Sequence, residues 1–421
     1  MKILLINEAF HPDAAASAQQ LTDLAVQIAE AGVEVTVLTS RRSYAEKGKQ
    51  YPAREKYRGI EIRRVRSPSL NRAGRKARMI DAMLLNLFFA WKLLWMKRQD
   101  KIVAMTSPPL VAWTAMVAAK LKKSEFIYWV MDVNPDQAVA AGWIKKGSLR
   151  ERISSAGLRQ VLAGSRKVIA MDSFMKERLS AKGAGAGKIK ILPPWSHDES
   201  LETVPHESNP FRIKHGWQSK FIIMYSGNHS ICHPLDTLLE TARQLKQDPN
   251  LLFVFIGGGQ RVRDVAEYKK KFGLENILQM PYQKREDLRY SLSAADLHVV
   301  TMGGPYVGIV HPCKIYGILK IGRPFVYIGP ETSPVGNLIR ETGVGYGVPH
   351  GDSQKLAWVI RNVRDQDVRQ KQQAELKEKE IAVRFSKATL CSEAVNFMLS
   401  ESENTRYGNG GKSLYADKNI A

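Results

Sequence analysis

Short apolar runs recur along this chain of 421 residues, and turn or helix signals follow each of them. The runs occupy residues 3–6, 33–39, 101–105, 126–130 and 167–171 in the first half, and residues 221–225, 252–256, 297–300 and 324–328 in the second. Strands that alternate with helices in this way form a parallel sheet. Because one hydrophobic core stops growing near about 250–300 residues, the chain is too long for a single core. We therefore predict an α/β protein with two Rossmann-like, doubly wound parallel-sheet domains.

The predicted boundary between the two domains is a stretch rich in Pro, Ser and Asn around residues 191–217, which has no sustained period. We place the N-terminal domain at residues 1–195, a linker at 196–217 and the C-terminal domain at 218–385. The amphipathic pattern of residues 386–400 predicts a helix that returns to the first domain. Residues 401–421 are polar and rich in Gly, which favours a flexible tail.

Composition excludes several classes of protein. The chain is 44% hydrophobic and 25% charged, as expected for a globular protein. Its three cysteines form no C-x-x-C pair, so neither a disulfide framework nor a zinc site is indicated, and a reducing compartment is favoured. The first residues read as a buried strand rather than a signal peptide. No stretch approaches the roughly 20 apolar residues that cross a bilayer, so we expect no membrane span.

The net charge of +22 predicts a polyanionic partner. Fourteen basic residues against three acidic ones lie in the block that begins at Arg41 and ends at Arg78. This block runs directly into an apolar, aromatic-rich stretch from Met79 to Met96. Basic flanks around such a helix are typical of contact with an anionic membrane surface. The alternative is a helix that packs on the sheet beside a solvated basic face.

Ligands of open parallel sheets collect at the carboxyl ends of the strands. The first strand is followed by a loop of small residues that includes Ala16 and Ser17 and leads into a helix. Small side chains allow a substrate close to the backbone, and the helix N-terminus offers free N–H groups to an anion. The same residues also allow close packing of helix on strand. A second such loop, after residues 101–105, contains Ser107.

Two carboxylates follow a fully apolar strand of the first domain. Asp132 and Asp136 come just after residues 126–130, where they can accept hydrogen bonds from sugar hydroxyls. The alternative for this segment is a helix start, with Asn134 as the cap and Pro135 in the first turn.

The second domain offers features suited to a diphosphate. Gly227 and Asn228 follow its first strand and give close access to the backbone, and Gly258 lies in a Gly run after its second strand. Lys314 is at the start of a predicted helix that ends at Gly322. A cation at a helix start is unfavourable unless an anion is bound there, so Lys314 is a candidate phosphate clamp. The alternative is a solvated lysine.

Taken together, the motifs resemble glycosyltransferase family 4, in the branch that makes exopolysaccharides, O-antigen and colanic acid. The resemblance runs from Met1 to about residue 400. Its carriers are HP at 11–12, TSPP at 106–109, DVNPD at 132–136, LPPWS at 192–196, YSGN at 225–228, IGGG at 256–259, PY at 281–282, PCK at 312–314 and GRP at 322–324.

The resemblance implies a GT-B fold, in which the two domains face a cleft. It implies that the second domain holds a nucleotide sugar, that the first holds a lipid-linked or polysaccharide acceptor, and that transfer retains the anomeric configuration with no metal and no cofactor. From the basic block and the apolar stretch after it, we expect a cytoplasmic protein that associates peripherally with the inner face of the cytoplasmic membrane. The resemblance places Gly227 and Asn228 at the diphosphate, Pro281 and Tyr282 beside the base, and Lys314 at the departing phosphate. With the candidates taken from the strand ends, the expected catalytic residues are Asp132 and Lys314. The expected donor-binding residues are Gly227, Asn228, Gly258, Pro281, Tyr282 and Lys314, and the expected acceptor-side residues are Ala16, Ser17, Ser107 and Asp136.

The chain departs from the wider family at two places. The usual pair of glutamates seven residues apart is missing, since Ile309 and Gly317 stand there. The usual Arg and Lys after the first strand of the second domain are replaced by residues 228–230 and their neighbours. Two alternatives stay open: a nucleotide-sugar 2-epimerase of the same fold, against which the aromatic and basic segment counts, and a nucleic-acid-binding protein, for which no reader motif is present.

Overall fold

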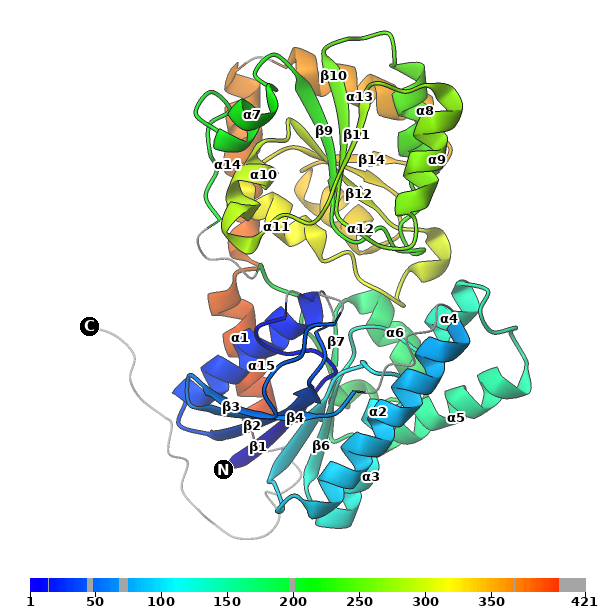
Figure 1. Ribbon diagram of the computed structural model, residues 1–421, viewed down its shortest axis with the longest axis vertical. Helices are drawn as coiled ribbons and strands as arrows, with labels where there is room; N and C mark the ends of the chain where they lie inside the picture. The colour runs from blue at the N-terminus through cyan, green and yellow to red at the C-terminus, as the bar shows by residue number, and fades with distance from the viewer. Residues whose placement is uncertain (14, 44–47, 68–74, 197–200, 367, 401–421) are drawn as a thin grey trace.

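The computed structural model describes residues 1–421 except 14, 44–47, 68–74, 197–200, 367 and 401–421, and it shows two lobes (Figure 1). The N-terminal lobe is built on an eight-stranded sheet of order β3-β4-β2-β1-β5-β6-β7-β8, and the C-terminal lobe on a six-stranded sheet of order β11-β10-β9-β12-β13-β14. All neighbouring strands are parallel except β3 and β4. The predicted pair of doubly wound α/β domains is confirmed.

The strands of the N-terminal lobe are β1 (Lys2–Ile6), β2 (Glu34–Ser40), β3 (Arg54–Tyr57), β4 (Ile60–Val65), β5 (Lys101–Ala104), β6 (Glu125–Trp129), β7 (Lys167–Ala170) and β8 (Ile189–Ile191). Its helices are α1 (Ala16–Glu30), α2 (Arg75–Trp95), α3 (Val111–Lys122), α4 (Asp136–Ala140), α5 (Leu149–Gly164), α6 (Ser173–Ala181) and the 3-10 turn η1 (Ala186–Lys188). The central strands are buried along nearly their whole length, as strands covered on both faces must be.

The strands of the C-terminal lobe are β9 (Phe221–Ser226), β10 (Leu251–Ile256), β11 (Ile277–Met280), β12 (Leu297–Thr301), β13 (Phe325–Ile328) and β14 (Tyr346–Val348). Its helices are α7 (Pro210–His215), α8 (Asp236–Gln244), α9 (Val262–Phe272), α10 (Leu288–Ser293), α11 (Lys314–Ile321), α12 (Pro334–Thr342), α13 (Ser353–Asp365) and α14 (Val368–Val383), with the 3-10 turns η2 (Arg285–Asp287) and η3 (Gly304–Tyr306).

The chain crosses between the lobes twice, and the two crossings touch. The first follows β8, and the second joins α14 to α15 (Lys387–Leu399), which packs against α1 of the N-terminal lobe (Figure 1). Gln27 Nε2 donates a 2.6 Å hydrogen bond to Ser392 Oγ across that contact. The backbone N–H of Ser196 donates to the carbonyl oxygen of Phe385, so the crossings are bonded to each other. The tail expected at 401–421 lies outside the described residues.

A short helix lies inside the stretch that we expected to be an irregular linker. Asn209 Oδ1 accepts a hydrogen bond from the backbone N–H of Phe211, Pro210 occupies the first turn of α7, and Gly216 ends the helix with a φ of 67°. The cap, the proline and the glycine each favour a helix locally. The run was too short to show a helical period.

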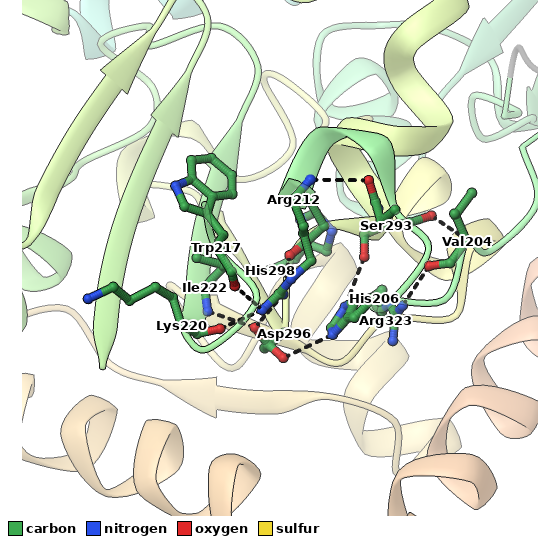
Figure 2. Close-up of polar contacts among 12 residues, drawn as sticks. Val204, His206, Arg212, Trp217, Lys220, Ile222, Ser293, Asp296, His298 and Arg323 are labelled. Carbon is green, nitrogen blue, oxygen red and sulfur yellow. Dashed lines mark hydrogen bonds and ion pairs between the residues drawn. The ribbon is translucent and has the colours of Figure 1, made fainter. Parts of the chain in front are cut away.

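Helix α7 is tied to the sheet by a buried polar network, shown in Figure 2. The side chain of Arg212 is 2% exposed and donates to Asp296 Oδ2 at 3.0 Å and to the carbonyl oxygens of Ala294 and Trp217, each at 2.8 Å. Asp296 Oδ2 also accepts from the backbone N–H of Ile222 at 2.7 Å. Since these groups stand where β9 and β12 begin, the network lies at the amino ends of the strands and has a structural role.

The lobes meet through the loop before α11. Its Ile309 carbonyl accepts from the backbone N–H of Val133 at 2.9 Å, and the buried His311 Nδ1 lies 2.7 Å from Asp172 Oδ2. A Cβ on Gly308 would stand 2.7 Å from the carbonyl oxygen of Phe174. This close approach, with a φ of 69° at residue 308, explains the glycine.

Candidate active site

Lys314 occupies a buried position at the carboxyl end of β9. It is the first residue of α11, as the sequence predicts, and Gly322 ends that helix with a φ of 65°. Its Nζ lies 3.5 Å from the centroid of the Tyr225 ring, and a Cβ on Gly227 would stand 3.5 Å from the same nitrogen. This Nζ is buried and has no hydrogen-bond partner among the described residues. Burial lowers the pKa of Lys314 to about 7.

Three glycines bring the turns after β9 and β10 together. Gly227, Gly257 and Gly259 have φ angles of 131°, 135° and 128°, which a residue with a side chain rarely adopts. A Cβ on Gly257 would stand 2.1 Å from the carbonyl oxygen of Gly227, and one on Gly259 would stand 2.4 Å from Asn228 Oδ1. The glycines are therefore required by the close approach of the two turns as well as by their backbone angles.

The predicted donor-binding residues gather around these turns. Gly258 lies against the edge of the Tyr282 ring, which a Cβ at residue 258 would approach to 3.0 Å. Pro281 follows β11, whose last residue accepts a hydrogen bond from the backbone N–H of Gly257. Gly227, Asn228, Gly258, Pro281, Tyr282 and Lys314 thus form one continuous cluster.

Two histidines of this cluster were not among the predicted site residues. His229 is buried, with Nδ1 3.1 Å from the Gly227 carbonyl oxygen, and its Nε2 has no partner among the described residues. Burial and the charge of Lys314 lower the pKa of His229 to about 4 and that of His233 to about 3. Both imidazoles are therefore neutral at neutral pH. The signal in the sequence that could have pointed to both histidines was their position shortly after β9, the first strand of the second lobe.

Asp132 belongs to the N-terminal lobe and lies near Cys313 of the C-terminal lobe. It lies in the loop after β6, and burial raises the pKa of its carboxyl to about 6. Burial and the nearby Asp132 charge raise the pKa of Cys313 to about 12, and the same carboxylate contributes to a raised pKa at Cys232. Asp132 therefore lies near Cys313, the residue before Lys314, but it is not among the charges that shift the pKa of Lys314.

The predicted acceptor-side residues divide into two groups, of which the first consists of Ala16, Ser17 and Ser107. Ser107 Oγ donates a 2.7 Å hydrogen bond to Glu8 Oε2, and burial raises the pKa of Glu8, a residue that the sequence analysis did not single out. Ser17 follows Ala16 at the start of α1, and its Oγ accepts from Asn7 Nδ2 at 3.5 Å. These groups meet at the adjacent ends of β1 and β5.

Asp136 stands apart from that group. Its carboxylate pairs with Arg178 Nη1 at 3.1 Å and with Lys182 Nζ at 2.9 Å, so it is held by α6 and the residue that follows it. Asn134, the candidate cap, does not cap α4, which has Pro135 at that position and no side-chain cap bond.

A pocket of about 230 Å³ lies between the lobes, beside the two crossings of the chain, and Asp172, His311, Tyr316 and Phe385 are among its lining residues. Across the ranges that the structure describes, no group of three or more His, Cys, Asp or Glu side chains is arranged to hold a metal ion. In the same ranges, no helix has the length and apolar character needed to cross a membrane.

Helix α2 is both a packed helix and an exposed apolar surface. Leu85, Phe89 and Leu93 are buried in the core of the lobe. On its outer side Trp91 and Trp95 are 62% and 74% exposed. Packing on the sheet and contact with a membrane, the two interpretations of this segment, are therefore compatible, because one face of the helix is buried and the other is exposed. Other exposed apolar residues of the same helix are Met79, Ile80, Met83, Leu87, Phe88 and Leu94.

Family models match both lobes. A glycosyl transferase 4-like domain matches residues 16–195, and the glycosyl transferases group 1 domain matches residues 208–381. Among curated relatives, the probable glycosyltransferase WbjE of Pseudomonas aeruginosa is 25% identical over 65% of this chain and 68% of its own length. The putative colanic acid biosynthesis glycosyl transferase WcaI of Escherichia coli is 22% identical over 83% of this chain and 88% of its own.

Solved structures show the same fold. HepE of Anabaena, in a complex with UDP-glucose, has a TM-score of 0.68 at 18% identity, covering 93% of this chain and 98% of HepE. WaaG, a glycosyltransferase involved in lipopolysaccharide biosynthesis, has a TM-score of 0.65 at 16% identity, covering 95% of this chain and all of WaaG (100%). With a glycosyltransferase domain in each lobe and this two-lobed architecture, the chain belongs to the family 4 glycosyltransferases of the GT-B fold.

Proposed function

We propose that this enzyme transfers a sugar from a nucleotide-sugar donor to a lipid-linked or polysaccharide acceptor in the synthesis of a cell-surface glycan, with retention of the anomeric configuration. The observation that carries the proposal is the buried Lys314 amine, which lies at the Gly227 turn without a hydrogen-bond partner among the described residues. The relatives support the same reaction, because WcaI is named for colanic acid biosynthesis and HepE was solved with UDP-glucose.

A nucleoside diphosphate would give Lys314 the anionic hydrogen-bond partner that none of the described residues supplies. A buried ammonium without a partner is unfavourable, and a cation at the first residue of a helix opposes the helix dipole. As the sugar leaves, negative charge grows on the diphosphate, and a positioned ammonium stabilises that charge without a metal ion. In this arrangement Gly227, Asn228 and Gly258 contact the diphosphate, and Pro281 and Tyr282 lie beside the base.

The N-terminal lobe holds the acceptor in this proposal. Asp132 accepts a hydrogen bond from a sugar hydroxyl at the reacting centre, and its pKa of about 6 leaves the carboxylate mostly ionised at neutral pH. Ser107 and Ser17 line the path of the acceptor beside Glu8. We further propose that the exposed face of α2, with the basic block before it, docks peripherally on an anionic membrane at the cytoplasmic side, where a lipid-linked acceptor is available.

The test is a transfer assay preceded by a thermal-shift screen of UDP-, GDP- and dTDP-sugars, because a ligand that binds the folded state raises the melting temperature. With the donor so identified, Lys314→Ala should lower kcat/KM at least about 100-fold, the scale of losing one group that stabilises a developing anion. The matched control is Lys320→Ala, six residues along in the same helix, which should transfer at nearly the wild-type rate.

Near-normal transfer by Lys314→Ala would remove the lysine from the reaction. The anomeric configuration of the product tests retention directly. Product analysis also separates transfer from epimerisation, since a 2-epimerase would change the nucleotide sugar without consuming an acceptor.

A further inference from the structure

Tyr225 contacts both Lys314, the proposed phosphate clamp, and Asn228 in the turn after β9. It is fully buried near the end of β9, and the face of its ring lies under Lys314 Nζ at 3.5 Å from the centroid. Its hydroxyl donates a 2.9 Å hydrogen bond to the carbonyl oxygen of Asn228. Tyr225 therefore links the amine to the turn that we assign to the diphosphate.

The Tyr225 ring is held in place by other aromatic groups. His229 packs edge-on against it, with ring centroids 4.9 Å apart and an interplanar angle of 67°, and Phe255 lies 6.4 Å away on β10. The ring therefore presents a defined face to Lys314. The face of an aromatic ring is electronegative and attracts an ammonium, most strongly where water is excluded.

We propose that Tyr225 is a positioning residue whose ring holds the Lys314 ammonium beside the Gly227 turn, ready for the diphosphate of the donor. This inference rests on the proposed function of Lys314. It assigns to Tyr225 no contact with the donor, only the placement of the lysine.

The ionisable side chains that the structure describes around Lys314 do not hold its amine by a hydrogen bond, so the contact of the amine with the Tyr225 ring is important. His229 and His233 come from the segment after β9, Cys313 precedes the lysine at the start of α11, and Asp132 approaches Cys313 from the other lobe. Among the described residues none of these gives Nζ a hydrogen bond. The face of the ring stabilises the charged form, so a ring with a weaker attraction should lower the pKa of Lys314.

The test replaces Tyr225 by phenylalanine and then by phenylalanines with one, three and five fluorines. Fluorine withdraws charge from the ring face while the ring keeps its size, so Tyr225→Phe is the reference and also accounts for the lost hydroxyl. Donor affinity should fall stepwise, reaching about tenfold at five fluorines, within the range measured for cations over rings. The pH above which affinity declines should move downward along the series, because the amine loses its proton earlier.

A second background separates positioning from a general packing effect. In Lys314→Ala the same fluorinated series should change donor affinity less than about twofold, since the partner of the ring is gone. Equal losses in both backgrounds, or no loss in the wild-type background, would overturn the role of Tyr225. Melting temperatures without donor identify any variant that fails to fold. If the wild-type protein binds no nucleotide sugar, the proposed function itself fails instead.

Discussion

Lys314, the proposed phosphate clamp, opposes the stability of the fold that carries it. Its amine is buried without a hydrogen-bond partner among the described residues, and its pKa is lowered to about 7 from an ordinary value of 10.5. The unfolded chain therefore binds more protons than the folded chain between these two pH values. It follows that the charge destabilises the fold fully below about pH 7 and progressively less as the pH rises towards 10.5.

Lys314→Met should therefore raise the melting temperature of the donor-free protein. The gain should be largest at pH 6 to 7 and should shrink as the pH approaches 10, because the folded wild-type amine is then neutral and the cost of removing its proton falls as the pH nears 10.5. Lys320→Met, near the other end of α11, is the control and should show no such pH dependence. Differential scanning calorimetry across this pH range is the measurement, and a loss of stability at every pH would contradict the argument.

A second prediction concerns Gly257. Alanine there must accommodate a φ of 135° and a Cβ only 2.1 Å from the Gly227 carbonyl oxygen. The strain should lower the free energy of unfolding by about 1–3 kcal/mol and should weaken donor binding, because the two turns are forced apart. Gly187→Ala is the control variant, since a Cβ at residue 187 meets no other atom of the described residues within 4 Å. Urea unfolding of both variants gives the comparison, and equal stability would show that the turns can separate freely.

Among single residues, the sequence pointed to some members of the candidate site and not to others, for a physical reason. Gly227, Gly258 and Lys314 could be found because each stands directly after a strand or at a helix start, where position alone implies a role. His229 and Glu8 also follow strands, but their significance depends on burial and on partners such as Lys314 and Ser107, which come from distant parts of the chain. Asp136 is the opposite case. The sequence around it gives no sign of its ion pairs with Arg178 of α6 and with Lys182, which follows that helix.

Among the elements, α6 connects the two lobes through its cap. Asp172 Oδ1 accepts a hydrogen bond from the backbone N–H of Met175 at 2.8 Å, which caps the helix. The other oxygen of the same carboxylate lies 2.7 Å from His311 Nδ1, and His311 Nε2 lies 2.6 Å from the Tyr316 hydroxyl. One side chain therefore fixes both the start of α6 and its contact with the segment that leads into α11.

Asp172→Ala should consequently be more damaging than the loss of an ordinary cap. Losing a cap costs about 0.5–2 kcal/mol, and leaving a buried hydrogen-bonding group without its partner costs about 1–3 kcal/mol more. The control is Asp352→Ala, which removes the cap of α13, where Asp352 Oδ1 accepts from the Lys355 N–H at 2.9 Å. Chemical denaturation measures both. Equal losses in the two variants would mean that the contact between the lobes contributes nothing.

The strands were predictable because buried parallel strands are short, nearly continuous apolar runs, and the runs at residues 3–6 and 221–225 appear in β1 and β9. Helix α7 was not, although Asn209, Pro210 and Gly216 are all helix signals. Six residues are less than two turns, so no hydrophobic period could develop. The stability of such a helix comes instead from tertiary contacts, here the Arg212 network of Figure 2.

For the whole molecule, exposed apolar residues are found on α3 and α5 as well as on α2. Helix α2 packs on α3 and α3 on α5, and these helices lie together on one side of the N-terminal lobe (Figure 1). Trp113 and Leu121 on α3 and Leu149 and Ile153 on α5 are exposed as well. Apolar groups spread over neighbouring helices mark an interaction surface more strongly than single exposed residues do. This distribution suits the flat, peripheral membrane contact that we propose.

The variant with both Trp91→Ala and Trp95→Ala tests that contact. Each side chain is more than 60% exposed at 62% and 74%, so truncation should leave the fold stable. Burying a large apolar side chain contributes about 1.5–3 kcal/mol, so partitioning onto vesicles with anionic lipid should fall at least about tenfold. Trp358→Ala is the matched control, because Trp358 is 59% exposed on α13 of the other lobe.

Cosedimentation at low and high salt separates the apolar from the electrostatic part of vesicle binding, since screening weakens only the attraction of the basic residues. Equal vesicle binding by all three proteins would place the membrane contact elsewhere, whereas a loss confined to the α2 variant would mean that the N-terminal lobe brings the proposed acceptor side to the bilayer.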